Sequence, residues 1–285
     1  DALLQLHEKV ILSPMDEEAT LLKKTTLLSI SALLVSLAKF QPADKKDVVE
    51  LNPEWIPAFM KCAATDCFAE YLKVVGGLAH LRPDQFTWEV YKADIEGFLQ
   101  STNVNTRGAA MKVLEEYTLA LLNFPTEDYS LLWADLFHSA IFLGGLLDPQ
   151  YSIRASFCNI LSQIPPHEFD KLKVADQRLA ITMILGASKD DSTMVKAQAC
   201  RALGVYILNN SLKVDLLFVS DAAVVLGEAM KEKNLTVKIR AAWSLANLCD
   251  TLVFVREAVH LPKDIDEISD IPKDILEKIA TSVIQ

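Results

Sequence analysis

The chain has 285 residues, of which 51% are hydrophobic and 23% are charged, and its formal net charge is −10 with an isoelectric point near 5.0. A nucleic-acid backbone is therefore not expected as the main partner, because polyanions are bound by clusters of Lys and Arg. Only 9 glycines occur, fewer than the average of about 7%, while aliphatic residues and alanine dominate. This composition predicts an all-α protein.

One register recurs six times along the chain. In each copy, small or apolar residues stand three and four places before an aliphatic anchor, and another apolar residue stands three places after it. A fixed period in this range is typical of stacked supersecondary units, because one such unit cannot bury its apolar face alone. The anchors are Ile30, Leu72, Leu114, Leu161, Leu203 and Leu245.

The copies differ in strength along the chain. The first two, at residues 22–33 and 64–75, are the weakest matches, and the second of them lacks the basic residue that the others carry. The later four keep both the basic residue and an apolar stripe with the period of a helix. These four copies lie at residues 106–117, 153–164, 195–206 and 237–248.

Other apolar-periodic segments lie between the copies, each separated from its register by a short polar turn. They occupy residues 54–62, 86–100, 128–147, 168–188 and 214–232. Each period is therefore predicted to hold an outer A helix and an inner B helix. Pro42, Pro83, Pro125 and the pair Pro165-Pro166 follow the B segments, because a proline cannot continue a helix.

The pattern predicts a right-handed α-solenoid of about six two-helix repeats, formed as one array over residues 1–285. The strongest repeats are expected at residues 84–124, 128–166, 168–210 and 213–252. Residues 253–285 are expected to begin a further repeat, because Ile275, Ile279 and Val283 continue the apolar period.

Two segments, Leu147-Asp148-Pro149 with Ile153-Arg154 and Val195-Lys196 through Gly204, resemble the consensus of the HEAT/armadillo-type repeat family. The resemblance covers most of the chain. It implies a ladder in which turn acids pair with the basic residue of a neighbouring B helix. The ladder would use Arg107, Asp148, Arg154, Lys196 and Lys238, with Asp190 or Asp191 as further acids.

No constellation typical of catalysis or metal binding is present in the sequence. The five histidines form no i, i+4 pair with another His or with Cys, and neither a phosphate-binding glycine loop nor a nucleophile elbow occurs. We therefore expect no enzyme activity, no catalytic residue, no cofactor and no metal. Close helix packing or a kink is expected for Gly76-Gly77 and Gly144-Gly145, rather than approach of a ligand.

Five cysteines, Cys62, Cys67, Cys158, Cys200 and Cys249, are odd in number and lack paired CxxC spacing. They are expected to be small buried thiols in a reducing compartment, which predicts a cytoplasmic or nuclear location. The chain starts at Asp1 without a basic and then apolar leader, so no secretory signal is expected. No membrane span is expected either, because the most apolar stretch, residues 131–147, is shorter than the roughly 20 residues that a span needs.

A second stripe on the B helices lies away from the core and is expected to line a concave groove. Trp243 and Asn247, one turn apart, resemble the Trp-x-x-x-Asn pairs with which the armadillo repeats of importin-α hold extended basic peptides. The other repeats lack this pair, and the nearby Arg201 and Arg240 favour an acidic or aromatic peptide. Two interpretations stay open: Trp243 is core, or it binds a partner. The candidate partner-binding residues are Trp243, Asn247, Arg240, Arg201, Gln198, Asn159 and Gln163.

These features predict a non-enzymatic scaffold that presents a curved helical surface to protein partners. The alternative is a transport or import-type adaptor that binds a linear peptide in the concave groove. Under both hypotheses the partner is a protein or a peptide.

Overall fold

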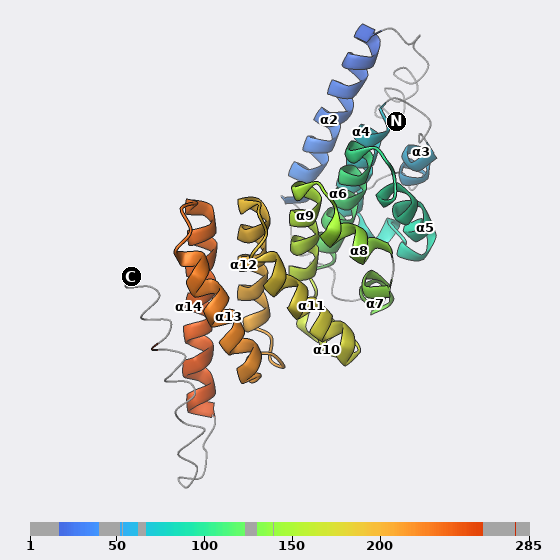
Figure 1. Cartoon of the computed structure of the whole chain (residues 1–285). Coiled ribbons are helices and arrows are strands. Elements are labelled where there is room, and N and C mark those ends of the chain that lie inside the picture. Colours follow the sequence, from blue (N-terminus) through green and yellow to red (C-terminus); the bar gives the residue numbers. More distant parts are fainter. Residues whose placement is uncertain are drawn as a thin grey trace. The chain divides into compact units, whose positions relative to one another are not determined.

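The computed structural model describes residues 17–39, 52, 54–61, 67–122, 130–138, 140–258 and 277. Over these residues the elements are helices and no strand is present, which confirms the all-α class (Figure 1). The chain divides into two compact units. Unit 1 comprises residues 1–128 with 139–144, and unit 2 comprises residues 129–138 with 145–285.

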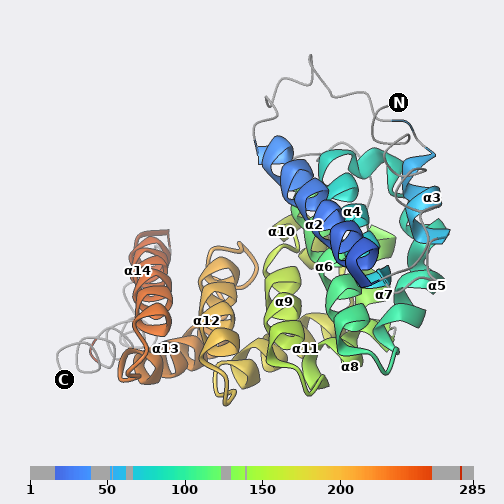
Figure 2. The same ribbon diagram turned by 90° about the horizontal axis from the view of Figure 1, so that it is seen from above.

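Unit 1 is a stack in which α2, α4 and α6 lie side by side (Figures 1 and 2). Two adjacent glycines on α4 face opposite neighbours. A Cβ atom added at Gly77 would lie 2.9 Å from Cβ of Leu34 on α2, and one added at Gly76 would lie 3.3 Å from Cα of Val113 on α6. The structure therefore confirms close helix packing at this glycine pair. The helices of the unit are α2 (Glu17–Lys39), α3 (Trp55–Lys61), α4 (Phe68–Leu81), α5 (Trp88–Leu99) and α6 (Val104–Leu121), with the 3-10 helix η2 (Pro83–Gln85) after α4.

The predicted anchors of unit 1 are only partly confirmed. Leu72 and Leu114 are completely buried, but Ile30 is only half-buried, so the register was wrong for the first copy. On α2 the buried residues are Lys23, Leu27 and Leu34 instead. Because Ser31 Oγ donates to the Lys73 carbonyl at 2.9 Å, the contact face of α2 is centred beside Ile30 rather than on it.

In unit 2, α9, α12 and α14 lie side by side in one row (Figures 1 and 2). These are the predicted B helices of the last three copies, and their anchors Leu161, Leu203 and Leu245 are buried, as the register predicts. The helices are α7 (Ser130–His138), α8 (Ala140–Leu147), α9 (Tyr151–Ser162), α10 (Pro166–Lys171), α11 (Val174–Ala187), α12 (Thr193–Ile207), α13 (Leu216–Met230) and α14 (Leu235–Ala258). The division between the units falls within α8.

Two predicted A helices are each replaced by a pair of helices. The segment 168–188 breaks at Leu172 and Lys173, whose backbones are extended and separate α10 from α11. Gln177 Nε2 donates to the carbonyls of Phe169 and Leu172 at 3.0 and 3.1 Å, so the break leaves these carbonyls bonded. The segment 128–147 likewise contains α7 and α8. Two periods therefore hold three helices each, whereas the last, with α13 and α14, holds the predicted two.

Hydrogen bonds to main-chain carbonyls tie the row of unit 2 together. Three polar side chains of α14 donate to carbonyls of α12: Ser244 to Cys200 at 2.7 Å, Asn247 to Gly204 at 3.1 Å and Thr251 to Ile207 at 3.4 Å. Tyr206 of α12 donates in turn to the Leu161 carbonyl of α9 at 3.0 Å. The short side chains of Ser244 and Thr251 allow the backbones of α12 and α14 to approach closely.

The ladder of turn acids and basic residues is present in unit 2. Arg154 pairs with Asp190 through two bonds of 2.8 Å, and Lys196 pairs with Glu232. Asp190 had been predicted, but Glu232 was missed, although it stands 42 residues after Asp190, as Asp190 stands 42 residues after Asp148.

Asp148 and Arg107 make the same local bonds as Asp190 and Arg154, which respectively accept from the Ser192 amide and donate to the carbonyls of Asp148 and Pro149. Asp148 Oδ1 caps its own turn by accepting from the Gln150 amide at 2.8 Å. Arg107 donates to the carbonyls of Ser101 and Thr102 at 2.9 and 3.2 Å, so it binds the main chain of its own turn. Lys238 is half-buried at the fourth position of α14, and its pairing stays a prediction.

One stretch of the described chain is long and apolar enough to cross a membrane, the segment Thr20–Ala38 of α2. The most apolar stretch of the sequence, residues 131–147, instead lies in the two short helices α7 and α8. Only 17% of the Thr20–Ala38 window is buried, although α2 packs on α4. Length and composition are the only features of α2 that suit a membrane, and a core helix can share both.

Candidate partner-binding surface on α9, α12 and α14

The candidate residues occupy equivalent positions on neighbouring helices of unit 2. Asn159 on α9, Arg201 on α12 and Trp243 on α14 are each 42 residues apart, as are Gln198 and Arg240 one turn earlier. Because α9, α12 and α14 lie side by side, equivalent positions form rows across the stack. We call this set the polar stripe, comprising Asn159, Gln198, Arg201, Arg240, Trp243 and Asn247.

Trp243 is the largest side chain of the polar stripe, and it is 43% exposed. It is therefore not a core residue, although one edge of its indole rests on α12. The contact occurs at Gly204, where an added Cβ would lie 2.6 Å from Cζ3 of Trp243. The missing side chain at Gly204 leaves room for the edge of the indole, and part of the Trp243 side chain faces solvent. An exposed Trp in a fixed position can anchor a partner.

Asn247 supports the same region. Its Nδ2 donates to the Gly204 carbonyl at 3.1 Å, and the residue is half-buried. This bond fixes the amide plane, while Oδ1 is an acceptor with two lone pairs. Trp243 and Asn247 thus both contact α12 at Gly204, and both offer part of their side chain to solvent.

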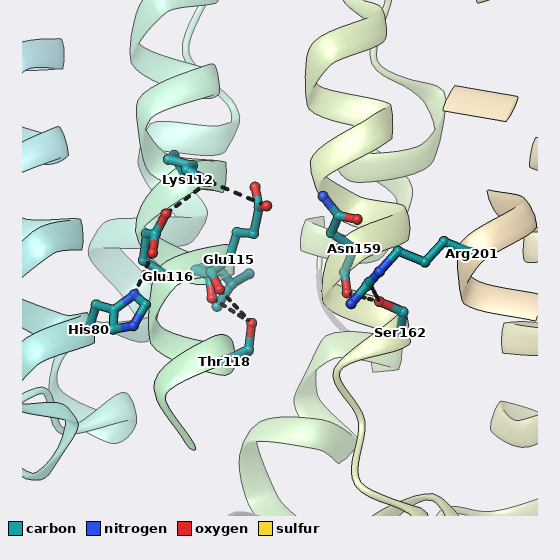
Figure 3. Close-up of polar contacts among 9 residues, drawn as sticks. His80, Lys112, Glu115, Glu116, Thr118, Asn159, Ser162 and Arg201 are labelled. Atoms are coloured by element: carbon teal, nitrogen blue, oxygen red, sulfur yellow. Dashed lines mark hydrogen bonds and ion pairs between the residues drawn. The ribbon is translucent and has the colours of Figure 1, made fainter. Parts of the chain in front are cut away.

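Two arginines bring positive charge to the polar stripe. Arg201 Nη1 donates to Ser162 Oγ at 2.8 Å, and Ser162 in turn donates to the Asn159 carbonyl at 2.7 Å (Figure 3). These contacts hold the half-buried Arg201 against the end of α9. Arg240 on α14 is exposed. The combination of an indole with guanidinium groups suits carboxylate and aromatic groups of a partner.

Gln163 is not part of this surface, which corrects the sequence-based prediction. Helix α9 ends at Ser162, and Gln163 is the C-cap residue, whose amide donates to the Ile160 carbonyl at 2.9 Å. Its side chain is only 5% exposed. Counting two places after the anchor assumed that α9 continues for another turn, as α12 and α14 do.

In unit 1 the positions on α6 that are equivalent to the polar stripe hold Lys112 and Glu116, which belong to an ionic cluster. Glu116 of α6 contacts His80 Nδ1 of α4 at 2.5 Å and Lys112 Nζ at 2.9 Å, and Glu115 lies 3.3 Å from Lys112 Nζ (Figure 3). Burial alone would raise the pKa of Glu116, but hydrogen bonds with His80 and Lys112 outweigh it and lower the pKa to about 2. Burial alone would lower the pKa of Lys112, but Glu115 and Glu116 raise it. The Glu116 carboxylate is thus bound within unit 1.

His80 was not predicted as the partner of Glu116. Its position did carry a signal, because Glu116 follows it by 36 residues, the same separation as in the pairs Arg154–Asp190 and Lys196–Glu232. The 36-residue separation is therefore a feature of the sequence that all three pairs share.

The described residues contain no group of three or more His, Cys, Asp or Glu side chains that could hold a metal ion. Cys67, Cys158 and Cys200 are buried thiols, and Cys249 is half-buried. Burial raises the pKa of Cys158 and Cys200 to about 12, so neither is a reactive thiolate near neutral pH. Cys62 lies outside the described residues.

Comparison with known proteins shows the fold class. No family model matches the chain. An uncharacterised protein of Dictyostelium discoideum is 38% identical over 138 residues, which are 48% of this chain and 9% of that protein, so the chain spans less than a tenth of the length of this relative.

Solved structures of designed proteins are similar over most of the chain. A designed armadillo repeat protein aligns over 84% of this chain and 97% of its own, with a TM-score of 0.55 at 12% identity. A second one, in complex with the peptide (KR)4, aligns over 80% of this chain and 98% of its own, with a TM-score of 0.51 at 13% identity. The protein is therefore an all-α repeat protein with an armadillo/HEAT-like fold.

Proposed function

We propose that the chain is a non-enzymatic, protein-binding scaffold and that its polar stripe holds an extended peptide segment of a partner. The observation that carries this proposal is Trp243 of α14, whose indole contacts α12 at Gly204 and which is still 43% exposed. Peptide binding is compatible with this kind of fold, since one of the similar designed proteins is in complex with the peptide (KR)4.

The chemistry of the stripe differs from that of a site for basic peptides. Arg201 occupies the position equivalent to Trp243, and Arg240 is exposed one turn before it. Two guanidinium groups repel a basic peptide and attract carboxylates, with which they form charge-assisted hydrogen bonds. The preferred segment therefore places an acidic residue beside an aromatic or aliphatic residue that covers the indole.

The experiment is a selection of random 12-residue peptides displayed on phage, followed by fluorescence anisotropy with the enriched sequence. We expect acidic and aromatic residues to be enriched. Arg240→Glu should weaken binding at least tenfold without loss of helicity, because Arg240 is exposed. Lys189→Glu, an equal charge change at an exposed turn residue outside the stripe, is the matched control. Equal binding by the Arg240→Glu variant would contradict the proposal.

An import-type adaptor for a basic linear peptide is the second candidate function. The single Trp243–Asn247 pair favours it, and the arginines oppose it. The same selection separates the two functions, since enrichment of Lys and Arg in the selected peptides would favour the adaptor.

The proposal includes a cytoplasmic or nuclear location, for which the buried thiols Cys158 and Cys200 are the support. Imaging of a fluorescent fusion in cells tests it. It also includes kinship with HEAT repeat-containing protein six, which the segment Val237–Asp250 resembles. A longer sequence that carries this register on both sides of residues 1–285 would test that kinship by alignment.

A further inference from the structure

A second surface of α14 is apolar and exposed. It consists of residues spaced by four, three, four, three and four places, which lie along one face of a helix. Leu235, Ile239 and Val253 are 69%, 58% and 50% exposed, and between them Ala242 and Ala246 are exposed and Cys249 is half-buried. We call these six residues the α14 stripe.

The α14 stripe lies opposite the face by which α14 packs on its neighbours. Val237, Ala241, Ser244 and Leu248 are buried, and Ser244 is bonded to the Cys200 carbonyl of α12. At 100° per residue, the buried residues centre roughly half a turn around the helix from the stripe. Helix α14 therefore has two apolar faces, and the described part of the chain covers only one of them.

Equivalent positions on α12 are all covered. Ala197, Cys200, Gly204 and Ile207 precede Ile239, Ala242, Ala246 and Cys249 by 42 residues each, and all four are buried. Helix α14 is what covers them, because Ser244, Asn247 and Thr251 donate to the carbonyls of Cys200, Gly204 and Ile207.

The same is true of α9. Ala155, Cys158 and Ser162, a further 42 residues earlier, are also buried, and Arg201 of α12 bonds to Ser162. In two successive helices of the row, these positions thus form the face that receives the next helix. The α14 stripe is the continuation of that face, with two alanines at its centre where a backbone can approach closely.

We propose that the α14 stripe binds a further helix of this repeat type, stacked on α14 as α14 is stacked on α12. The chemistry of this helix follows from the interface already present. The face of α14 that α12 receives has small residues at its centre, Ala241 and Ser244, with Val237 and Leu248 on either side. The bound helix should share this pattern, since Leu235, Ile239 and Val253 would pack around its central small residues.

The probe is a fluorescein-labelled synthetic peptide with the sequence of residues 235–254, which carries the required face. We expect it to bind the whole chain, and the double substitution Ala242→Glu/Ala246→Glu in the chain should weaken binding at least tenfold. Both alanines are exposed, so the variant should keep its helicity and its unfolding midpoint. Val224→Glu on α13, an exposed position away from the stripe, is the control and should bind the probe as the unchanged chain does.

Three results would overturn the proposal. The first is no binding of the probe to the unchanged chain. The second is binding that survives Ala242→Glu/Ala246→Glu, which would mean that the probe replaces α14 on α12. The third is self-association of the chain that this double substitution abolishes in sedimentation, which would make a second copy the occupant.

Discussion

Replacing Gly204 with alanine tests how closely α12 and α14 approach. The added Cβ would lie 2.2 Å from Ser244 Oγ, 2.6 Å from Trp243 Cζ3 and 2.8 Å from Ser244 Cβ. All three distances are below van der Waals contact, and the Ser244 Cβ atom cannot move without its helix. The substitution should therefore push α14 away from α12 and weaken the bond from Asn247 to the Gly204 carbonyl.

Two effects of opposite sign decide the magnitude. Alanine is the better helix former by about 1 kcal/mol, whereas overpacking of a closely packed interface costs about 1–3 kcal/mol. Since three contacts are violated here, we place the packing cost near the upper end of that range and expect a net loss of about 1–2 kcal/mol. For a chain of this size, such a loss lowers the melting temperature by about 2–8 °C.

The assay is thermal and urea unfolding followed by circular dichroism, with Gly186→Ala as the matched control. Gly186 lies in α11 of the same unit, and a Cβ there would meet nothing within 4 Å, so that variant should gain up to about 1 kcal/mol. If Gly204→Ala is stabilised as much as Gly186→Ala, the close approach of α12 and α14 is refuted.

Three further predictions concern the core, the ionic cluster and the thiols. Leu203→Ala should lower the free energy of unfolding by about 2–5 kcal/mol, because Leu203 is 0% exposed. Leu208→Ala, at a 53% exposed position, should change the free energy of unfolding by less than about 0.5 kcal/mol. Equal losses in the two variants would contradict the register. Because the pKa of Glu116 is lowered from 4.5 to about 2, its contribution to stability is present above pH 4.5 and is lost as the pH falls towards 2. In the Glu116→Gln variant, the free energy of unfolding measured in urea should therefore depend less on pH over that range. In native maleimide labelling, the half-buried Cys249 should react before the buried Cys158 and Cys200, which should react only on unfolding; prompt labelling of Cys200 would contradict the packing of α12.

The repeat register could be read from the sequence because it is a property of residue spacing. Leu72, Leu114, Leu161, Leu203 and Leu245 are buried as predicted, since each lies on a face of its helix that packs on neighbouring helices. The first copy failed at Ile30, because the spacing of apolar residues on α2 allows more than one stripe. The contacts of Ser31 with Lys73 and of Leu34 with Gly77 show which of them is buried.

The candidate surface could be predicted less well, because it depends on helix ends and on contacts between repeats. Gln163 was misplaced because nothing in the spacing shows that α9 ends at Ser162. The break between α10 and α11 was missed because Leu172 and Lys173 are ordinary helix formers, and the Gln177 amide stabilises the break only in three dimensions. For Trp243, the interpretation as a core residue is wrong, since the residue is 43% exposed although its indole touches Gly204, and partner binding stays a prediction.

The separations of the contacts explain how such a chain can specify a partner. Side-chain bonds between neighbouring helices of the row span 39 to 45 residues, as in Arg201 with Ser162 and Tyr206 with Leu161, so each repeat is bonded to the next one along the chain. Stability is then close to a sum of repeat and interface terms, and an exposed residue can change without disturbing distant repeats. Each row of equivalent positions is consequently free to vary one repeat at a time. Asn159, Arg201 and Trp243 form one such row, with an amide, a guanidinium and an indole, and a peptide lying along it would meet a different chemical group at each helix.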